Sequence, residues 1–191
     1  PRTGYHTEKD NPVARLFWGR CIIEKAAVFS FYNKGSRIRS LIHNLKYKGI
    51  KEIGYELGRI YGLSLKSSGF TGEIDLILPV PLHPSKKRIR GFNQSELISN
   101  GISEVTGLPV NILSLSRIAV SETQTRRSRY ERWVNVEGIF CVSAPEELRG
   151  KHLLLVDDVI TTGSTIESCA NELLKVEGVK VSVVALAYAV I

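Results

Sequence analysis

A run of acids and hydroxyl-bearing residues stands between a short apolar segment and an amphipathic pattern near the end of this 191-residue chain. Four apolar residues, Leu153–Val156, precede the stretch Asp157–Thr165, which reads Asp-Asp-Val-Ile-Thr-Thr-Gly-Ser-Thr. An uninterrupted apolar run of this length is typical of a strand that is covered on both faces, as in a parallel sheet. The order strand, polar loop, helix therefore predicts an α/β fold with a loop at the carboxyl end of a buried strand.

The residues after this stretch complete the pattern of a βαβ unit. Apolar side chains recur with helical spacing at Ile166, Cys169, Ala170, Leu173 and Leu174. Gly178 is expected to end the helix, and Val179–Leu186 is expected to form the next apolar strand. Parallel strands joined by a helix make right-handed crossovers, so we predict a central, mostly parallel sheet flanked by helices.

The chemistry of Asp157–Thr165 indicates a sugar phosphate as the ligand. Backbone N–H groups at a helix start, with Thr and Ser hydroxyls beside them, make a phosphate cradle, and Gly163 allows the backbone to approach closely. Two carboxylates pointing into that cradle would repel a phosphate. They are explained if they face ligand hydroxyls or a divalent cation instead.

This stretch closely resembles the phosphoribosyl pyrophosphate (PRPP) motif of type I phosphoribosyltransferases. In that family the two acids bind the ribose hydroxyls and the Thr-Gly loop binds the 5′-phosphate. The resemblance implies a catalytic role for Asp157 and Asp158. The implied 5′-phosphate ligands are Thr161, Thr162, Gly163, Ser164 and Thr165. The main alternative, the acidic pair of a response regulator, lacks the Thr-Gly loop, and a generic dinucleotide binder would need a Gly-x-Gly-x-x-Gly that is absent here.

A second resemblance is to ComF-like phosphoribosyltransferases, which are associated with competence and the uptake of single-stranded DNA. It is carried by Leu41–Gly49, Pro79–Pro84, Lys86, Arg88, Arg90–Gln94, Gln124, Arg132 and Asn135. Relatives usually begin with a four-cysteine zinc ribbon, and no such cysteines occur here. We therefore divide the chain into an N-terminal extension over residues 1–25 and a phosphoribosyltransferase domain over 26–191, with a small hood from N-terminal segments near Val28–Leu65.

The net charge of +7 is concentrated in two segments. Four cations and no acid lie between Pro84 and Asn93, four arginines and one acid lie between residues 126 and 132, and the rest of the chain is balanced. By position in the resembled fold, the first segment is the pyrophosphate loop, with Lys86, Arg88 and Arg90 sharing one face of an extended chain. A solvated charge run is the alternative interpretation.

The second cationic segment, Ser121–Arg132, is polar and has no apolar periodicity. It is the best candidate for the flexible loop that closes over the site in type I enzymes, with Gln124, Arg126, Arg127 and Arg129 as its functional residues. Arginines there can neutralise departing pyrophosphate, and they can equally hold a nucleic acid backbone. The sequence leaves these two roles open.

The remaining elements follow from periodicity and punctuation. We predict strands at Ala26–Phe31, Ile74–Leu78 and Val136–Val142, and helices capped by Ser36 and ended by Gly49, from Lys51 to Leu65, and from Gln94 to Thr106. Gly54, Gly58 and Gly62 recur every four residues in the second helix, which indicates close packing against another backbone. His83 and His43 are titratable near neutral pH, and a structural hydrogen bond is the favoured role for each.

The totals exclude several classes of protein. The three cysteines, Cys21, Cys141 and Cys169, are too scattered for a disulfide framework or a Cys-x-x-Cys zinc site and are expected to be buried free thiols. The longest apolar run, Val181–Ile191, is too short for a membrane span, no signal peptide is visible, and we expect a cytoplasmic protein.

The resemblance implies a Mg²⁺-dependent enzyme that transfers phosphoribose from PRPP to an unknown nitrogenous acceptor and releases pyrophosphate. Mg²⁺ would be held mainly by pyrophosphate and ribose oxygens, with no direct protein ligand assigned. The alternative is a non-catalytic, PRPP-sensing accessory protein of DNA uptake that binds single-stranded DNA. A homodimer is compatible with both functions.

Overall fold

The computed structural model describes residues 2–118 and 139–189. The first half of the chain forms a short 3₁₀ turn and then helices and strands in the order η1 (Tyr5–Thr7), α1 (Pro12–Arg15), β1 (Ala26–Phe31), α2 (Arg37–Lys48), α3 (Lys51–Ser67), β2 (Leu76–Pro79), α4 (Pro84–Arg90) and α5 (Gln94–Thr106). The second half contributes β3 (Leu115–Arg117), β4 (Phe140–Val142), α7 (Pro145–Leu148), β5 (His152–Ile160), α8 (Ser164–Leu173) and β6 (Lys180–Tyr188).

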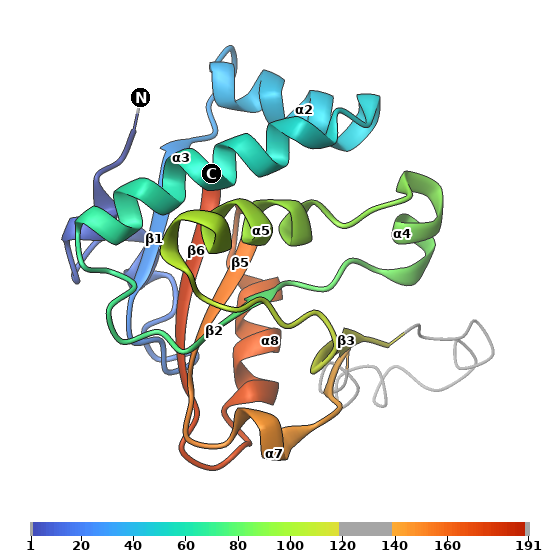
Figure 1. Cartoon of the computed structure of the whole chain (residues 1–191). Helices are drawn as coiled ribbons and strands as arrows, with labels where there is room; N and C mark the ends of the chain where they lie inside the picture. The colour runs from blue at the N-terminus through green and yellow to red at the C-terminus, as the bar shows by residue number, and fades with distance from the viewer. Residues whose placement is uncertain (1, 119–138, 190–191) are drawn as a thin grey trace.

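The central sheet is parallel throughout and has the strand order β1-β6-β5-β2 (Figure 1). The register pairs Asp157 with Ala185 of β6 and Leu155 with Leu78 of β2, so the acidic segment lies on an inner strand. Strands β3 and β4 form a separate antiparallel pair. The predicted α/β fold with a parallel sheet flanked by helices is confirmed.

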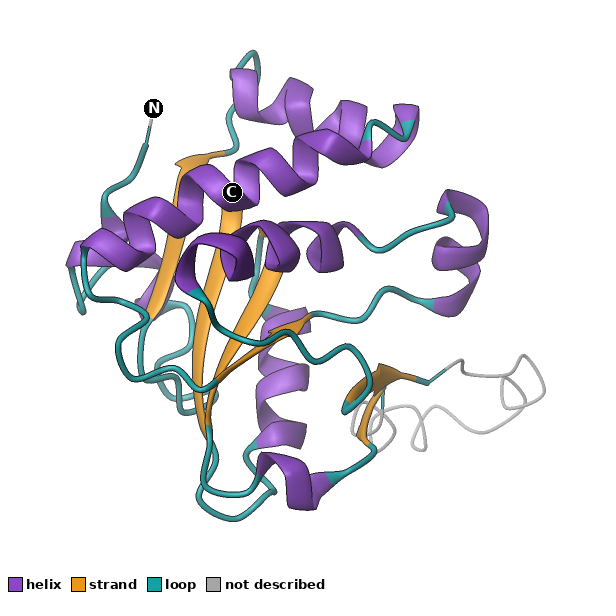
Figure 2. Ribbon diagram, viewed as in Figure 1, coloured by secondary structure: helices purple, strands orange, loops and turns teal. Residues whose placement is uncertain are grey.

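The two faces of the sheet bury different layers of helices (Figure 2). Leu153 and Leu155 pack with residues of α8 and α1, whereas Leu154 and Val156 pack on the other face with residues of α2, α3 and α5. This alternation follows from the two-residue repeat of a strand, and it explains why the run is apolar at every position.

Strand β5 is longer than the sequence analysis predicted. It continues through both acids to Ile160, because Asp157 and Val159 still pair with β6. The acids therefore lie inside the strand rather than in the loop after it. Helix α8 ends at Leu173 instead of near Gly178, and Gly178 occupies the left-handed turn before β6 with φ 71°.

The first 25 residues pack into the same core as the sheet. Val13 and Phe17 are at most 1% exposed and belong to the cluster that covers the α8 face. Asn11 caps α1 by accepting from Val13 N and Ala14 N, and its Nδ2 donates to Ala26 O at 2.8 Å. This segment therefore packs into the fold, and its division from the domain over residues 26–191 stays a prediction.

Helices α3 and α5 cross at very short range, which confirms the packing role of the glycine row. A Cβ at Gly58 would lie 2.3 Å from the carbonyl oxygen of Ile98, and a Cβ at Gly101 would lie 2.1 Å from that of Tyr55. No side chain fits at either position without moving a backbone. Strand β1 is an edge strand of the main sheet, and the hood over Val28–Leu65 stays a prediction.

The prediction that Lys86, Arg88 and Arg90 share one face of an extended segment is wrong. They lie on helix α4, which projects away from the sheet in Figure 1. Pro84 occupies the first turn, the His83 ring accepts from Ser85 N at 3.2 Å, and Gly91 ends the helix with φ 80°. With about 100° between successive residues, Lys86 and Arg90 share a helix face and Arg88 points the opposite way.

The hydrogen bond from Ser85 N to the His83 ring is the backbone hydrogen bond expected for a structural histidine.

The cysteines differ in burial, and the helices are short or polar. All three cysteines are free, but only Cys169 is buried; Cys21 is half-buried and Cys141 is exposed. The expectation that all three are buried is therefore wrong for Cys141, which lies on the short strand β4. Within residues 2–118 and 139–189, no helix is long and apolar enough to cross a membrane.

Candidate functional site

The loop Thr161–Gly163 leads from the carboxyl end of β5 into α8. Gly163 has φ 79° and precedes the first residue of the helix. A Cβ there would lie 2.9 Å from the Phe17 ring, so both conformation and space require glycine. The hydroxyls of Thr162 and Ser164 are exposed and lie 3.0 Å apart. The loop therefore presents exposed hydroxyls, two of which are hydrogen-bonded to each other, and the first turn of a ten-residue helix, which together favour an anion.

Arg20 fixes this loop from the N-terminal segment. Its Nη1 donates to the carbonyl oxygen of Thr162 at 2.8 Å and to that of Leu16 at 3.1 Å. Its Nη2 forms an ion pair with Glu167 in the first turn of α8. The guanidinium thus adds positive charge beside the loop and ties it to α1. The sequence analysis missed Arg20, because 142 residues separate it from Thr162.

Asp158 is a buried carboxylate that is fully engaged by two side chains. Lys46 Nζ from the last turn of α2 lies 2.9 Å from its Oδ1 and 2.8 Å from its Oδ2. Gln94 Nε2 donates to Oδ2 at 2.8 Å. Asp158 is 6% exposed, so its carboxylate has lost the water that would solvate it at the surface. The contacts with Lys46 and Gln94 replace the hydrogen bonds to that water.

Asp157 points to the other side of the strand and is only partly buried. Its Oδ1 accepts from Ser95 Oγ at 3.2 Å and from Asp158 N at 2.8 Å. Burial, followed by the charge of Asp158, raises its pKa to about 7. A carboxyl that titrates near neutral pH can bind a hydroxyl either as donor or as acceptor.

The first turn of α5 holds both acids in place. Asn93 caps this helix by accepting from Ser95 N at 3.1 Å, and its Nδ2 donates to Val80 O, just after β2, at 3.0 Å. The next two residues, Gln94 and Ser95, then reach Asp158 and Asp157 respectively. The sequence Asn-Gln-Ser thus has a physical explanation: one residue anchors the helix and two bind the acidic pair.

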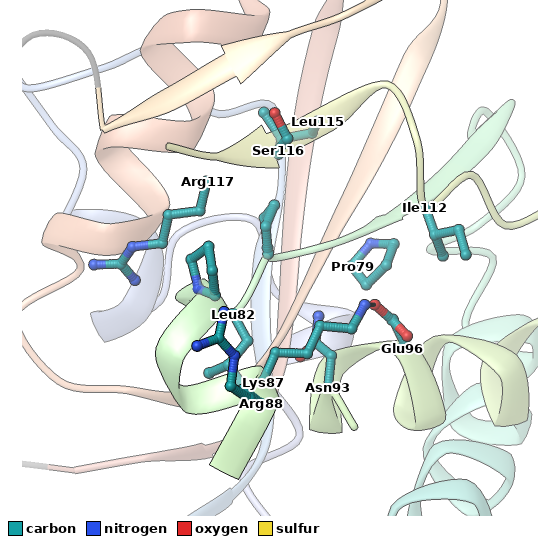
Figure 3. Close-up of a pocket in the computed structure, with 12 residues that line it drawn as sticks. Pro79, Leu82, Lys87, Arg88, Asn93, Glu96, Ile112, Leu115, Ser116 and Arg117 are labelled. Atoms are coloured by element: carbon teal, nitrogen blue, oxygen red, sulfur yellow. Dashed lines mark hydrogen bonds and ion pairs between the residues drawn. The ribbon is translucent and has the colours of Figure 1, made fainter. Parts of the chain in front are cut away.

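The cations of α4 border a separate hollow of about 370 Å³ at the end of β2 (Figure 3). Lys87 and Arg88 line it from α4, and Leu115 and Ser116 line it from β3. Lys87 is paired with Glu96 at 3.0 Å. None of the twelve residues drawn in Figure 3 comes from the stretch 157–165, so this hollow lies beside the acidic pair without including it.

The sequence-predicted pyrophosphate residues are therefore dispersed. Arg88 lines the hollow, Lys86 does not, and both are exposed. Arg90 Nη1 and Arg117 Nε are buried donors with no hydrogen-bond partner among the described residues. Such donors are available to an anion. The predicted flexible-loop residues Gln124, Arg126, Arg127 and Arg129, like Arg132 and Asn135, lie outside the described residues.

The side chains around the acids offer few ligands for a metal ion. Within the part of the chain that the structure describes, no group of three or more His, Cys, Asp or Glu side chains could hold one. Asp158 is already engaged by Lys46, which leaves Asp157 as the accessible carboxylate of the pair. This arrangement fits a cation bound through one carboxylate and otherwise by ligand oxygens and water, as Mg²⁺ often is.

A family model, described as "Phosphoribosyl transferase domain", matches residues 60–190. The chain belongs to this family. The matched region contains β2, α4, α5, β5, α8 and β6, so the acidic pair and the loop after β5 lie within it, whereas Arg20 and Lys46 precede it. The predicted membership of the type I phosphoribosyltransferases is confirmed.

Curated relatives carry names that agree with the ComF-like resemblance. The chain is 33% identical over 138 residues to "DNA utilization protein YhgH" of Escherichia coli, covering 71% of this chain and 60% of that protein. It is 31% identical over 153 residues to "Competence protein F" of Haemophilus influenzae, covering 78% of this chain and 67% of that protein. The chain thus spans about three fifths of the length of the first of these relatives.

A solved structure titled as adenine phosphoribosyltransferase is also similar. It has a TM-score of 0.46 and 14% sequence identity, and the match covers 77% of this chain and 74% of that one.

Proposed function

We propose that this phosphoribosyltransferase domain binds PRPP and transfers phosphoribose to a nitrogen acceptor. One observation carries the proposal: an acidic pair, with Asp158 buried and Asp157 partly buried, and an exposed hydroxyl loop follow each other at the carboxyl end of one inner strand. Ligands of open α/β sheets bind at such strand ends. A sugar diol and a phosphate are the two groups that these neighbouring features suit.

Each part of PRPP has residues proposed for it. The 5′-phosphate would contact the loop from Thr161 to Thr165, and the ribose hydroxyls would face the acidic pair. Lys86, Arg88 and Arg90 remain the proposed pyrophosphate residues, supported by the unpartnered Nη1 of Arg90. In the transfer, a bond forms between the acceptor nitrogen and C1 of ribose while the bond from C1 to the pyrophosphate oxygen breaks. Pyrophosphate leaves with that electron pair, and the nitrogen loses a proton to solvent.

Mg²⁺ is part of the proposal as an ion brought mainly by the substrate. Asp157 would hold it or the ribose hydroxyls, and the ion would neutralise charge on the pyrophosphate oxygens. The protein's own contribution is then to orient the ribose and the phosphate. The closing role of Gln124, Arg126, Arg127 and Arg129, and a cytoplasmic location, stay predictions.

The double variant Asp157→Asn with Asp158→Asn tests the site. It should abolish detectable PRPP binding in calorimetry while circular dichroism shows a folded protein. Unchanged PRPP affinity would contradict the assignment. A pyrophosphate-release assay with a panel of nucleobases and amines would then test turnover and identify the acceptor.

A second candidate function is a PRPP-sensing accessory role in DNA uptake. Two observations favour it: the names of the relatives concern DNA utilization and competence, and α4 places several cations on a projecting helix. This reading expects no pyrophosphate release with any acceptor, together with salt-sensitive binding of single-stranded DNA. Turnover with any acceptor would favour the enzyme. A homodimer is compatible with either function and stays a prediction.

A further inference from the structure

Gln94 holds a buried acceptor that nothing in the described part of the protein satisfies. Its side chain is 4% exposed, and its Oε1 has no hydrogen-bond partner among residues 2–118 and 139–189. Leaving a buried carbonyl oxygen unpaired costs free energy, so such atoms in a native fold call for an explanation. Gln94 lies beside the acidic pair, where the proposed function places a ligand with several hydroxyls.

The orientation of the Gln94 amide follows from its other contact. Oδ2 of Asp158 lies 2.8 Å from the amide and also accepts from Lys46 at 2.8 Å. A carboxylate only accepts hydrogen bonds, so the amide atom facing it must be the NH₂ group. The amide is planar, and Oε1 is therefore turned away from Asp158. The geometry of the network makes Oε1 the free atom.

Lys46 is what keeps this network in order. It contacts both oxygens of Asp158 from the last turn of α2, on a side chain that is 22% exposed. Without an ammonium there, Asp158 would be a buried carboxylate held by one neutral amide, and it would reorganise toward water. Gln94 would lose the partner that fixes its rotamer. Lys46 thus acts on the site through Asp158 and is a positioning residue.

The two acids are consequently unequal as ligand-binding groups. Asp158 is occupied by Lys46 and Gln94 and is almost inaccessible. Asp157 is more exposed, and the hydrogen bonds it makes with described residues both reach Oδ1. Among the described residues, the acceptors of this network without a hydrogen-bond partner are then Oδ2 of Asp157 and Oε1 of Gln94.

We infer that Gln94 is a specificity-determining residue whose Oε1 accepts a hydrogen bond from a hydroxyl of the bound phosphoribosyl group, and that Lys46 positions it through Asp158. The inference rests on the proposed function, since it names the group that reads the sugar at the same site. It assigns sugar recognition to Asp157 and Gln94 together instead of to the two acids alone. A sugar that lacks the hydroxyl leaves Oε1 unpaired and binds less well.

The test pairs changes in the protein with changes in the sugar. Calorimetry would measure the affinity of the full chain for ribose 5-phosphate and for its 2-deoxy and 3-deoxy counterparts. The wild-type protein should bind one deoxy sugar about tenfold more weakly than ribose 5-phosphate, as expected for one hydrogen bond to a buried acceptor. Gln94→Met keeps the length of the side chain but has no acceptor. This variant should bind ribose 5-phosphate and the deoxy sugar with about equal affinity.

The positioning role of Lys46 has its own signature. Lys46→Met should reduce the preference for the hydroxylated sugar, and Lys46→Arg should restore most of it because the positive charge beside Asp158 returns. Lys25→Met, which removes a half-buried lysine that pairs with the exposed Glu73, is the matched control and should leave the preference unchanged. Ser99→Ala, which removes another unpartnered polar atom of α5, should also leave it unchanged.

The outcomes separate this inference from the proposed function. The inference is wrong if Gln94→Met is folded and keeps the full wild-type preference for ribose 5-phosphate over the deoxy sugar. It is also wrong if the wild-type protein binds PRPP but binds ribose 5-phosphate and both deoxy sugars with equal affinity. If the wild-type protein binds neither PRPP nor ribose 5-phosphate, the proposed function fails instead. Gln94→Asn withdraws the acceptor by one methylene and retains an amide, so it provides the same measurement should Gln94→Met not fold.

Discussion

Asp157 lies where burial and a second carboxylate act on it in the same direction. Both effects disfavour its charged form, so its pKa is raised from 3.8 to about 7. Between these two values the folded protein binds a proton that the unfolded chain has released. The contribution of Asp157 to the free energy of unfolding is therefore greatest at acid pH and declines as pH rises toward 7.

Asp157→Asn should remove this pH dependence. Relative to the wild-type protein, the variant's free energy of unfolding should increase as pH rises from about 4.5 to about 7.5, because only the wild-type protein must ionise a buried carboxyl over that range. Urea denaturation of both proteins at several pH values measures the difference. A difference that does not change with pH would contradict the raised pKa.

Asp10→Asn is the matched control for that titration. Asp10 is exposed, and a hydrogen bond from Arg15 lowers its pKa below 3.8. Its stabilising contribution is present above that value and is lost only as pH falls below it. The stability difference between Asp10→Asn and the wild-type protein should therefore be constant between pH 4.5 and 7.5.

Individual residues were predictable where a local rule determines their role. Ser36 caps α2, Gly49 ends it in the left-handed region, and Gly163 stands where a side chain would strike Phe17. The partners of the acids could not be predicted in this way. Lys46 lies 112 residues before Asp158 and Gln94 lies 64 residues before it, and no local pattern reports a contact over such a separation.

Helices α3 and α5 depend on two glycines at their crossing. Gly58→Ala would place a methyl group 2.3 Å from the carbonyl oxygen of Ile98, so the helices must separate. We expect a loss of about 1–3 kcal/mol in the free energy of unfolding, typical of overpacking. Because α5 carries Gln94 and Ser95, the displacement should also weaken binding at the acidic pair. Chemical denaturation measures the first effect, and calorimetry with PRPP measures the second.

Gly72→Ala is the control for this substitution. Its Cβ would meet only the carbonyl oxygen of Gly69 at 3.4 Å, an ordinary contact distance. Stability within about 0.5 kcal/mol of the wild-type value is expected there, as for surface substitutions in general. Equal effects at Gly58 and Gly72 would mean that the helix crossing does not depend on the missing side chain.

Elements were predicted well where apolar periodicity is strong and poorly where charge obscures it. Helix α5 has the predicted bounds, and β1 has them as well. Helix α4 was missed because its seven residues include four cations and no buried side chain, so no apolar stripe marks it. The sequence signals of this helix lie at its two ends: a proline in the first turn and a left-handed glycine after the last turn. The sequence analysis interpreted these two residues as the boundaries of a loop.

Arg20 joins the loop Thr161–Gly163 to the segment that follows helix α1. Arg20→Met should free the Thr162 carbonyl and the Glu167 carboxylate, so the loop loses its tie to the N-terminal segment. We expect faster hydrogen exchange at residues 161–165 and an affinity for PRPP reduced about fivefold, in keeping with the loss of one charge-assisted contact. Mass spectrometry of exchange at the loop provides a readout that does not require a ligand.

Arg15→Met separates this effect from a general loss of charge. Arg15 lies in the same segment, and its ion pair with Asp10 is exposed and remote in sequence from the loop. Exchange at residues 161–165 should be unchanged in Arg15→Met. An equal increase in both variants would show that Arg20 acts only by supporting the N-terminal segment.

At the scale of the whole molecule, the sheet order determines where the site lies. The sequence predicted parallel strands, because the βαβ pattern is local. It did not predict that β1 would pair with β6, which follows it by more than 150 positions along the chain, since strand order depends on long-range packing. That pairing makes β6 an inner strand, while β5 is an inner strand because β6 and β2 flank it. Helix α2 follows β1, and its Lys46 reaches Asp158.

The excess positive charge of the molecule includes exposed cations on α4. Lys86→Gln with Arg88→Gln removes two exposed cations from α4 and lowers the net charge from +7 to +5. If α4 binds pyrophosphate, affinity for PRPP should fall about tenfold or more, since contacts to phosphate from charged side chains are strong. Affinity for ribose 5-phosphate, which has no pyrophosphate, should not change. Lys9→Gln with Arg149→Gln gives the same net charge from other exposed positions and should leave both affinities unchanged.

Binding of a single-stranded oligonucleotide at several salt concentrations tests the alternative role of α4. If α4 instead contacts a nucleic acid backbone, the double variant should reduce the slope of log affinity against log salt by about 0.7 for each lost contact, or about 1.4 in total. PRPP affinity would then stay at the wild-type value. That combination would contradict the pyrophosphate assignment, because the net charge of the control variant is the same and only the position of the missing cations differs.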